Sequence, residues 1–556
     1  MKPNFEIYSA SAGSGKTFTL AKTYLQKVLA DRNEESFKRI LALTFTNKAC
    51  EEMKSRILIS LSEFAKNTST KKPSDILKSV ERESTLDYRS IQLKSKKILQ
   101  KILHNFSFFQ VSTIDSFNHN LIRSFSNELN IVSDFLVVLD SEEIIDESIN
   151  KILSDLDKES LVSRLLVDFS NEKIKDGKSW DVSYDLKELS KLLFNENIQE
   201  HIKKLGLLKT DQFYELKRNI QSSIIKIKKE ILSNVKKCKD CIEKTGLKPD
   251  FTRNTFPNFL DQIQKNKYLN KSNENLEKLF LTNRVFKKNE YNKHEIKSLE
   301  KELFKYFKFI DKKISDLKLN KSLLRSVVPA SVLNKIKKAT KNIQDERKEI
   351  LIGEFNLIIS NEIKDQPAPY IYEKVGNKIE HFLIDEFQDT SKLQWSNLIP
   401  LISHTLESCE SSKLPGSLTI LGDVKQSLYR WRGADPSSFA LLLDKHNPFT
   451  TEKKIKHLPH NYRSKKEIVE FNNSFFSHIS QIFNYSENRI AYSEAHQQAI
   501  KKNEGYVSIE FTNESSDKDK KQNDFLKKTH LIINESLKRG FNYSDQCVLV
   551  RNRKEQ

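Results

Sequence analysis

The sequence predicts an α/β protein with a parallel sheet and a long helical insertion. Short apolar runs are each followed by a polar or glycine-containing segment and then by residues at helical spacing. One such segment, ASAGSGKT at Ala10–Thr17, has the form of a phosphate-binding loop. Between Leu121 and Pro369 the chain instead becomes rich in lysine and asparagine, with a helical period and four glycines.

The phosphate-binding loop follows a predicted strand at Phe5–Ala10 and precedes a helix with Leu20, Tyr24 and Val28 on one face. Glycines let backbone N–H groups turn toward phosphate oxygens, and the start of the helix adds its positive dipole end. The lysine would bridge the β- and γ-phosphates, and the next hydroxyl would bind Mg²⁺. A chance glycine turn would lack this context, although alanine replaces the first glycine of the general pattern. The expected nucleotide-binding residues are Ala10, Ser11, Ala12, Gly13, Ser14, Gly15, Lys16 and Thr17.

Two further strands are predicted at Arg39–Thr46 and Phe106–Ser112, and each ends in polar residues before a helix. Ligands of open parallel sheets bind where the strands end. The side chains there are therefore candidate ligand contacts. By position alone, Phe45 is as well explained as a core residue as by stacking on a base.

The segment 121–369 is predicted to be a helical domain inserted into the α/β core. Residues 201–250 hold thirteen Lys and Arg against six Asp and Glu. A basic surface suits a nucleic acid backbone, because each neutralised phosphate adds about 0.9 to the salt dependence on duplex DNA and about 0.7 on single strands. A solvated helix surface explains any single lysine better, and no base-reading motif is visible.

The composition of the whole chain restricts its class. Its 556 residues carry a net charge of +19, which favours a nucleic acid or an anionic membrane surface, although lysine-rich compositional drift explains part of it. Five scattered cysteines indicate a reducing compartment, and the lone CxxC of Cys238 and Cys241 fits two helical cysteines better than zinc. No apolar run approaches a membrane span. We expect a soluble, cytoplasmic protein of two or more domains.

Two adjacent carboxylates follow the predicted strand Ile379–Asp385, in the sequence DEFQDT. Such a pair is costly at a strand end unless a cation or a proton transfer uses it. Asp385 suits the Mg²⁺ shell through water, and Glu386 suits the base that orients and deprotonates an attacking water. Gln388 and Asp389 are candidate linkers to neighbouring motifs. A helix N-cap cluster would explain Asp389 but not the pair.

The stretch Leu421–Asp435, LGDVKQSLYRWRGAD, follows another apolar run and combines an amide, two aromatic residues and two arginines within seven residues. We predict that it lies between an ATP site and a single nucleic acid strand. Farther on, NYRS contains Arg463, which could reach a γ-phosphate, and Tyr462, which could stack on a base; by themselves these four residues indicate nothing. Strand-like runs also occur at Gly505–Phe511 and Val548–Val550.

Together, in order and approximate spacing, these motifs resemble those of the UvrD/RecB-type superfamily 1 DNA helicases. The matching segments are ASAGSGKT, LALTFTNKACEEM, VSTIDSF, LIDEFQDTS, LGDVKQSLYRWRGAD, NYRS and VLVRNR. GKTFT, TIDSF and GDVKQS are similar to the RecB/AddA branch of that family. The resemblance implies a RecA-like P-loop NTPase core with a parallel sheet, a large helical insertion, and the start of a second RecA-like domain.

The resemblance also implies site residues, with ATP and Mg²⁺ as cofactors. Gln426 would contact the γ-phosphate and couple it to DNA, and Tyr462 would stack on adenine. Phe18 stands where UvrD-like members carry an adenine-facing arginine, which leaves nucleotide selectivity open. The implied catalytic residues are Lys16, Asp385, Glu386, Gln426 and Arg463, with Thr17 and Asp385 at the metal. The implied single-stranded DNA track consists of Phe45, Thr46, Asn47, Thr113, Trp431 and Arg432.

The implied activity is that of an ATP-dependent 3′–5′ DNA helicase or translocase in recombinational repair. It would act on single-stranded DNA and duplex ends, without a membrane and with a possible nuclease or helicase partner subunit. The implied domains are a first motor domain at 1–120 and 370–455, the insertion at 121–369, and an incomplete second motor domain at 456–556. Because the chain ends before the family's later motifs, the alternative is a DNA-binding or assembly subunit that lacks the second motor half. A P-loop kinase is disfavoured, since it would not use DEFQDT together with GDVKQSLYRWRGAD.

Overall fold

The structure is a computed structural model of the chain. It describes residues 4–66, 74–83, 86–129, 131–157, 159–244, 251–265, 273–287, 294–363, 378–407, 416–444, 446–484, 489, 491–492, 495–502, 505–511 and 518–553. The described residues form two compact units, one of Met1–Ser9 with Thr17–Lys456 and the other of Ala10–Lys16 with His457–Gln556. The predicted domain division stays a prediction, and its boundary at 369–370 lies outside the described residues.

A six-stranded sheet organises the first unit, in the order β3-β2-β6-β7-β1-β8. β1 pairs with β7, β7 with β6, β6 with β2, and β2 with β3, and all four pairings are parallel. Parallel pairing brings the carboxyl ends of these five strands to one edge of the sheet. The predicted parallel α/β core is thereby confirmed. The strands are β1 (Phe5–Ser9), β2 (Ile40–Thr44), β3 (Val111–Thr113), β6 (His381–Ile384), β7 (Ser417–Gly422) and β8 (Lys453–His457).

Three predicted strands differ from the structure. Of the run Phe106–Ser112, Phe106–Phe108 is a 3₁₀ helix and the strand covers Val111–Thr113, since this outer strand pairs with only three residues of β2. Gly505–Phe511 and Val548–Val550 are not strands. In the described part of the chain neither run has a partner strand, and a strand needs one to satisfy its backbone groups.

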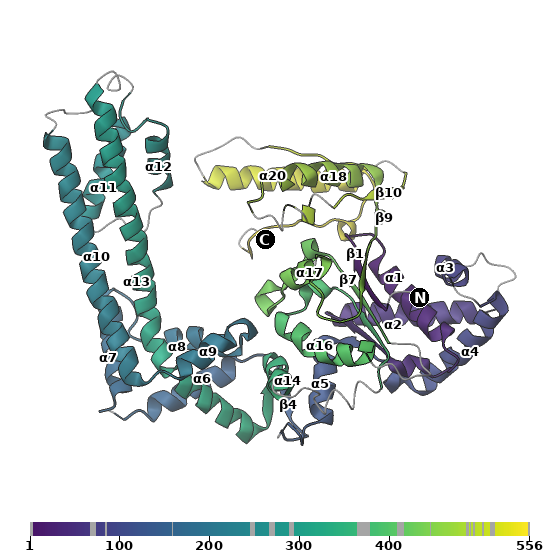
Figure 1. The fold of residues 1–556 in the computed structure, drawn as a ribbon. Helices are drawn as coiled ribbons and strands as arrows, with labels where there is room; N and C mark the ends of the chain where they lie inside the picture. Colours follow the sequence, from purple (N-terminus) through teal and green to yellow (C-terminus); the bar gives the residue numbers. More distant parts are fainter. Residues whose placement is uncertain are drawn as a thin grey trace. The chain divides into compact units, whose positions relative to one another are not determined.

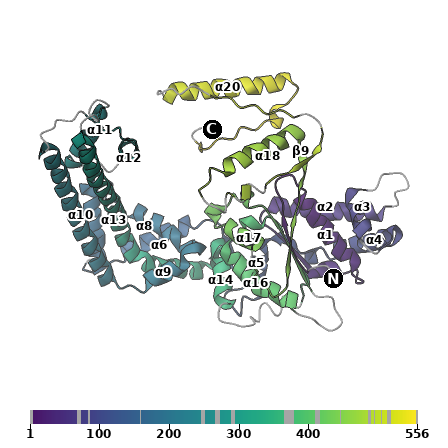
Figure 2. The ribbon, with the colours of Figure 1, turned by 45° about the horizontal axis from the view of Figure 1, so that its top comes forward.

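Helices cover both faces of the sheet (Figures 1 and 2). On one side lie α1 (Lys16–Ala30) and α2 (Asn47–Ala65), followed by α3 (Asp75–Glu83) and α4 (Tyr88–His104). The predicted apolar face of α1 is confirmed, because Leu20, Tyr24 and Val28 are fully buried. The strands share a second hydrophobic core with the helices on the other side. Those helices are α5 (Ile114–Ser124), α14 (Phe355–Ile363), α16 (Lys392–Glu407) and α17 (Pro436–Leu443).

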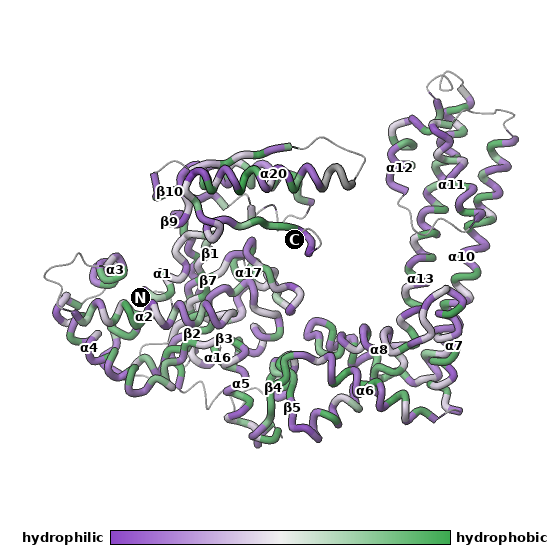
Figure 3. Tube along the Cα trace, turned by 180° about the vertical axis from the view of Figure 1, so that it is seen from behind, coloured by the Kyte–Doolittle hydropathy of each residue, from purple (hydrophilic) through white to green (hydrophobic). Residues whose placement is uncertain are grey.

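The predicted insertion is mostly helical. Its two long helices, α10 (Thr210–Lys244) and α13 (His294–Arg347), lie side by side (Figures 1 and 2). Hydrophobic and hydrophilic residues alternate along both helices (Figure 3), as expected for helices with one buried face. A short parallel pair, β4 (Leu136–Val138) and β5 (Glu349–Leu351), was not predicted. The other helices are α6 (Glu142–Ser154), α7 (Leu161–Lys175), α8 (Ser183–Ser190), α9 (Gln199–Gly206), α11 (Thr255–Gln264) and α12 (Glu274–Leu281).

The cysteine pair of the CxxC lies within α10, where Cys238 is fully buried. Among the residues that the structure describes, no group of His, Cys, Asp and Glu is arranged to hold a metal ion. None of the helices in the described ranges has the length and apolar character needed to cross a membrane.

The second unit contains a parallel pair of strands, β9 (His460–Lys465) and β10 (Gln498–Lys501). Its helices are α18 (Lys466–Ser480), which packs on both strands, and α20 (Lys518–Lys538). The NYRS motif lies in β9.

A half-buried histidine, His381, connects β6 to its neighbours. Nδ1 of His381 lies 2.9 Å from Oγ of Ser417, to which Nζ of Lys27 donates a hydrogen bond of 2.5 Å. Burial, together with the charges of Lys27 and Arg39, lowers the pKa of His381 to about 3. The imidazole is therefore neutral in the folded protein and accepts a hydrogen bond from the Ser417 hydroxyl.

We predict that His381→Gln weakens the acid sensitivity of the fold. Because the unfolded chain binds a proton at His381 below a pH of about 6.5 while the folded chain does not, stability is lost as the pH falls from there. Between pH 7 and pH 5.5 this histidine should account for about 1.3 kcal/mol of the loss. Chemical denaturation at both pH values measures it. His104→Gln, at an exposed position of α4, is the control and should leave the difference unchanged.

Candidate nucleotide and nucleic acid site

The candidate site lies where the parallel strands end. Asp385 follows β6 and Asp423 follows β7, and both carboxylates are buried. Thr46 lies two residues after β2, and Thr113 is the last residue of β3. The structure thus brings the predicted site residues Asp385, Thr46 and Thr113 to one edge of the sheet, although they are far apart in the sequence, and adds Asp423, which was not predicted.

Glu386 has a backbone conformation that is unusual for its residue type. Its φ is 50° and its ψ is 43°, in the left-handed region that glycine favours. Such a conformation persists where the surroundings enforce it, and it is frequent at functional sites. The N–H of Glu386 donates to Oδ1 of Asp385 at 2.9 Å, so the two predicted acidic residues form a local turn.

Gln388 connects the acidic turn to β7. Its Nε2 donates to Oε2 of Glu386 at 2.7 Å, and its Oε1 accepts from the N–H of Asp423 at 2.9 Å. Gln388 is 1% exposed, so water cannot replace these bonds. Asp423 in turn accepts a hydrogen bond of 2.7 Å from Nε2 of Gln426. One buried amide thereby connects the proposed base to the segment that carries the proposed γ-phosphate contact.

The DEFQDTS segment is hydrogen-bonded to Leu421–Asp435 beyond Gln388 as well. Oδ1 of Asp389 accepts from the N–H of Leu428 at 3.2 Å, and burial raises the pKa of Asp389. The carbonyl of Thr390 accepts from the N–H of Asp435 at 3.0 Å. Ser391 and Ala434 form an antiparallel bridge. We call the whole set of contacts between these two segments the seam. It begins at Gln388, which joins Glu386 to Asp423, and ends at the bridge between Ser391 and Ala434.

The seam presents an aromatic and cationic cluster. The rings of Phe45 and Tyr429 lie 4.5 Å apart, and the guanidinium of Arg432 lies 5.6 Å from the centre of the Phe45 ring and 5.7 Å from that of Trp431. Trp431 is 79% exposed, which is rare for so large an apolar side chain and leaves its face open for stacking. Three residues predicted for the DNA track, Phe45, Trp431 and Arg432, thus lie together.

Of the other residues predicted for the DNA track, Thr46 and Thr113 have structural roles as helix caps. The Thr46 hydroxyl accepts from the N–H of Ala49 and caps α2, and the Thr113 hydroxyl accepts from the N–H of Ser116 and caps α5, each at 3.2 Å. Thr113 is 7% exposed. Asn47, in the first turn of α2, is exposed. Their contact with DNA stays a prediction.

In the second unit, the glycine loop packs against NYRS. Gly13 and Gly15 have φ values of 78° and 87°, and a Cβ on Gly13 would lie 2.9 Å from Cβ of Arg463. The N–H of Tyr462 donates to the carbonyl of Gly13 at 2.9 Å. Arg463 and Tyr462, both predicted to serve the nucleotide, therefore lie beside the loop. Glycine is required at position 13 both for its backbone conformation and for this close approach.

Two observations fit the loop to a phosphate. Its glycines hold a turn of the kind that points backbone N–H groups outward, and Oγ of Ser14 is buried with no hydrogen-bond partner among the described residues. Lys16, Thr17 and Phe18 form the first turn of α1. Asn461 and Gln497 were not predicted, yet their side-chain amides donate to the carbonyl of Ala12 at 3.3 and 3.1 Å.

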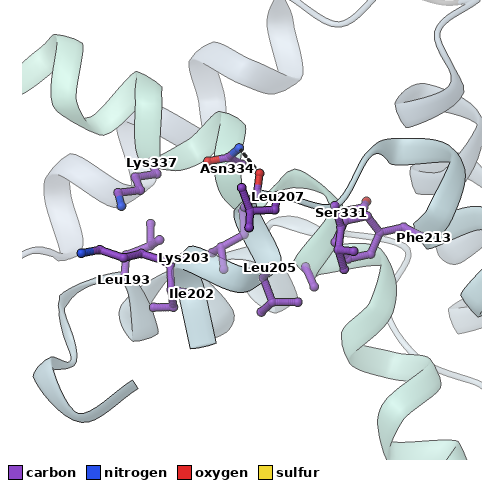
Figure 4. Close-up of a pocket in the computed structure, with 13 residues that line it drawn as sticks. Leu193, Ile202, Lys203, Leu205, Leu207, Phe213, Ser331, Asn334 and Lys337 are labelled. Carbon is purple, nitrogen blue, oxygen red and sulfur yellow. Dashed lines mark hydrogen bonds between the residues drawn. The ribbon is translucent and has the colours of Figure 1, made fainter. Parts of the chain in front are cut away.

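The structure also contains a cavity of about 320 Å³ in the helical insertion, at a distance from these residues in the chain (Figure 4). Its lining is mostly apolar, with Ile202, Leu205 and Phe213, and includes Lys203 and Lys337. The described residues that line it include no carboxylate and no glycine loop. Its chemistry does not suit a nucleotide with bound Mg²⁺.

Comparison with known proteins identifies similar sequences. The model of the UvrD/REP helicase N-terminal domain matches residues 6–450. In an alignment of 514 positions that covers 85% of the chain, it is 24% identical to the A subunit of the ATP-dependent helicase/nuclease of Staphylococcus haemolyticus. It is 26% identical to the protein of the same name from Ligilactobacillus salivarius over 88% of the chain, and 26% identical to that from Clostridium botulinum over 85%. The chain spans 38% of the length of each of these relatives.

We predict that Gln388→Ala lowers the free energy of unfolding by about 1–3 kcal/mol, because it leaves the buried N–H of Asp423 without an acceptor. Denaturant unfolding measures the change. Gln100→Ala makes the same truncation at an exposed position of α4 and should change stability by less than about 0.5 kcal/mol. Equal stabilities of the two variants would contradict a structural role for the Gln388 bridge.

Proposed function

Because the chain belongs to the UvrD/Rep helicase family, we propose that it is an ATP-dependent DNA helicase or translocase that moves 3′–5′ along single-stranded DNA in recombinational repair. The observation that carries this proposal is the seam, which connects Glu386 and Gln426 on one side to Trp431 and Arg432 on the other. A motor needs such a connection, because nucleotide hydrolysis must change its hold on DNA.

On the nucleotide side, Lys16 would bridge the β- and γ-phosphates, while the loop from Ala10 to Ser14 encloses them with its N–H groups. Thr17 and Asp385 would hold Mg²⁺, Asp385 through water; when bound, the ion neutralises charge on the phosphates. Glu386 would orient the attacking water and take its proton. Its hydrogen bond from Gln388 supports this role, since it restrains the carboxylate.

Gln426 and Arg463 would detect the γ-phosphate, and Tyr462 would stack on adenine. Support for the arginine comes from its place against Gly13, and support for the tyrosine from its 54% exposure. Phe18 carries no charge for the base, so we propose that ATP is held mainly through its phosphates.

On the nucleic acid side, Trp431 and Phe45 would stack on bases and Arg432 would contact the backbone, together with Thr46, Asn47 and Thr113. Stacking tolerates any base sequence, as a translocase requires. On α10, Lys226, Lys228 and Lys229 are exposed, which supports contact of the insertion with the phosphates of duplex ends. The relatives are named as one subunit of a helicase/nuclease, which supports a further protein chain as partner.

We predict that Glu386→Gln slows ATP hydrolysis by about 10²–10⁴-fold, because the amide cannot take a proton from water. Steady-state ATP hydrolysis with saturating single-stranded DNA measures the rate. Nucleotide binding, followed with a fluorescent ATP analogue, should be retained. Glu143→Gln, on the exposed side of α6, is the control. Hydrolysis at the parental rate by the Glu386 variant would refute its role as the base.

We predict that Trp431→Ala raises the DNA concentration for half-maximal ATPase stimulation by about 5- to 150-fold, the equivalent of one lost stacking contact. ATP hydrolysis is titrated with oligothymidine. Trp180→Ala removes an equally exposed indole from the insertion and should not change the titration. If the tryptophan were structural, nucleotide binding would weaken together with DNA stimulation.

A further inference from the structure

A ring of polar groups, closed through one turn of α5, joins the helical insertion to the seam. Glu196 begins a 3₁₀ helix (Glu196–Ile198) just before α9. Its Oε2 accepts from Oγ of Ser391 at 2.6 Å, and its Oε1 accepts from Nδ2 of Asn356 at 2.5 Å. One carboxylate from the insertion thus contacts both α14 and the residue at which the seam ends.

The ring continues through the core. Asn356 accepts from Nδ2 of Asn118 at 2.7 Å, and Asn118 lies on α5 one turn after Asp115. Asp115 accepts from Nε2 of Gln394 at 3.2 Å. Gln394 and Ser391 then close the ring by a reciprocal pair of bonds, at 2.9 and 3.1 Å. Four members, Asn118, Asn356, Ser391 and Gln394, are at most 7% exposed.

The ring borders on the proposed DNA track. The charge of Arg432 acts on Asp115, and Ser391 is bridged to Ala434, two residues after Arg432. Both carboxylates are half-buried, and this burial raises the pKa of Asp115 and that of Glu196. Removing a carboxylate from water costs free energy, and proteins do so where hydrogen-bond partners hold the group in a defined geometry.

We propose that Glu196 is a positioning residue through which the helical insertion holds the seam and, with it, Trp431 and Arg432 in their DNA-binding arrangement. This inference rests on the proposed function. Asn356 also lies within 121–369, but its helix α14 packs in the core shared with the sheet. Glu196 alone of the ring's members comes from outside the core that the sheet forms with its covering helices, and it accepts hydrogen bonds from two core elements at once. A change in the placement of the insertion on DNA would therefore reach the seam through this carboxylate.

The test compares Glu196→Ala with the parental full chain. ATP hydrolysis is titrated with oligothymidine to give the half-saturating DNA concentration, and the DNA-free rate is measured separately. We expect the half-saturating concentration to rise about 2- to 30-fold, with the DNA-free rate unchanged. Glu196→Gln should recover much of the loss, because an amide can accept from Asn356 and donate to Ser391. Glu200→Ala, an exposed glutamate of α9, is the matched control.

Two further variants test whether Glu196 acts through the DNA track. If Glu196 acts through the track, Glu196→Ala combined with Trp431→Ala should bind DNA no more weakly than Trp431→Ala alone. Should Glu196→Ala not fold, Glu196→Asp retains the charge but is too short to reach both partners, and it should raise the half-saturating concentration.

Three outcomes overturn the inference: parental titration by the folded Glu196 variant, an equal fall in the DNA-free rate, or full additivity with Trp431→Ala. A parental chain without any DNA-stimulated hydrolysis would instead refute the proposed function itself.

Discussion

The first unit depends on the hydrogen-bonded seam between DEFQDTS and Leu421–Asp435. Both segments leave neighbouring parallel strands at the same edge of the sheet, so their backbones would enter a buried region with unsatisfied polar groups. The seam satisfies them with Gln388, Asp389 and Thr390. Because these bonds are buried, the two segments cannot move independently. A displacement of one segment therefore displaces the other. Coupling between nucleotide hydrolysis and DNA binding requires such a connection.

The seam also explains why a glutamate adopts a left-handed backbone conformation. Asp385 accepts from the N–H of Glu386 on one side of the turn, and Gln388 restrains its carboxylate on the other. The strain stays local because β6 and the following 3₁₀ helix are both buried. A carboxylate held in this way needs no reorganisation when water approaches it, and preorganisation of this kind favours catalysis.

The helical insertion has its own hydrophobic core between α10 and α13 and yet is tied to the motor core by polar groups. An apolar junction tolerates sliding, whereas the ring through Glu196 and Asn356 demands one arrangement, since each lost bond leaves a buried group unpaired. The insertion is therefore both a surface for nucleic acid and an element that can hold the seam in place.

The sequence alone predicted much of the core and many of the candidate site residues. Short apolar runs and helical apolar spacing predicted the parallel core and the α1 face, since burial imposes those patterns locally. The family motifs indicated Lys16, Asp385, Glu386 and the Leu421–Asp435 stretch, because phosphate and metal chemistry restrict residue type. The strands predicted at Gly505–Phe511 and Val548–Val550 were wrong. A strand also needs a partner strand, and the local sequence does not show whether one is present.

Tertiary structure alone decided the rest. The sequence indicated Gln388 as a linker but not what it joins, and Glu196 is an ordinary carboxylate in the sequence. The partners that give these two residues their roles lie 35 and 195 positions away. The left-handed backbone of Glu386 and the exposure of Trp431 depend likewise on the packing of the segments around them. The sequence gives the chemistry of each residue, but buried polar groups find their partners only when folding brings distant segments together.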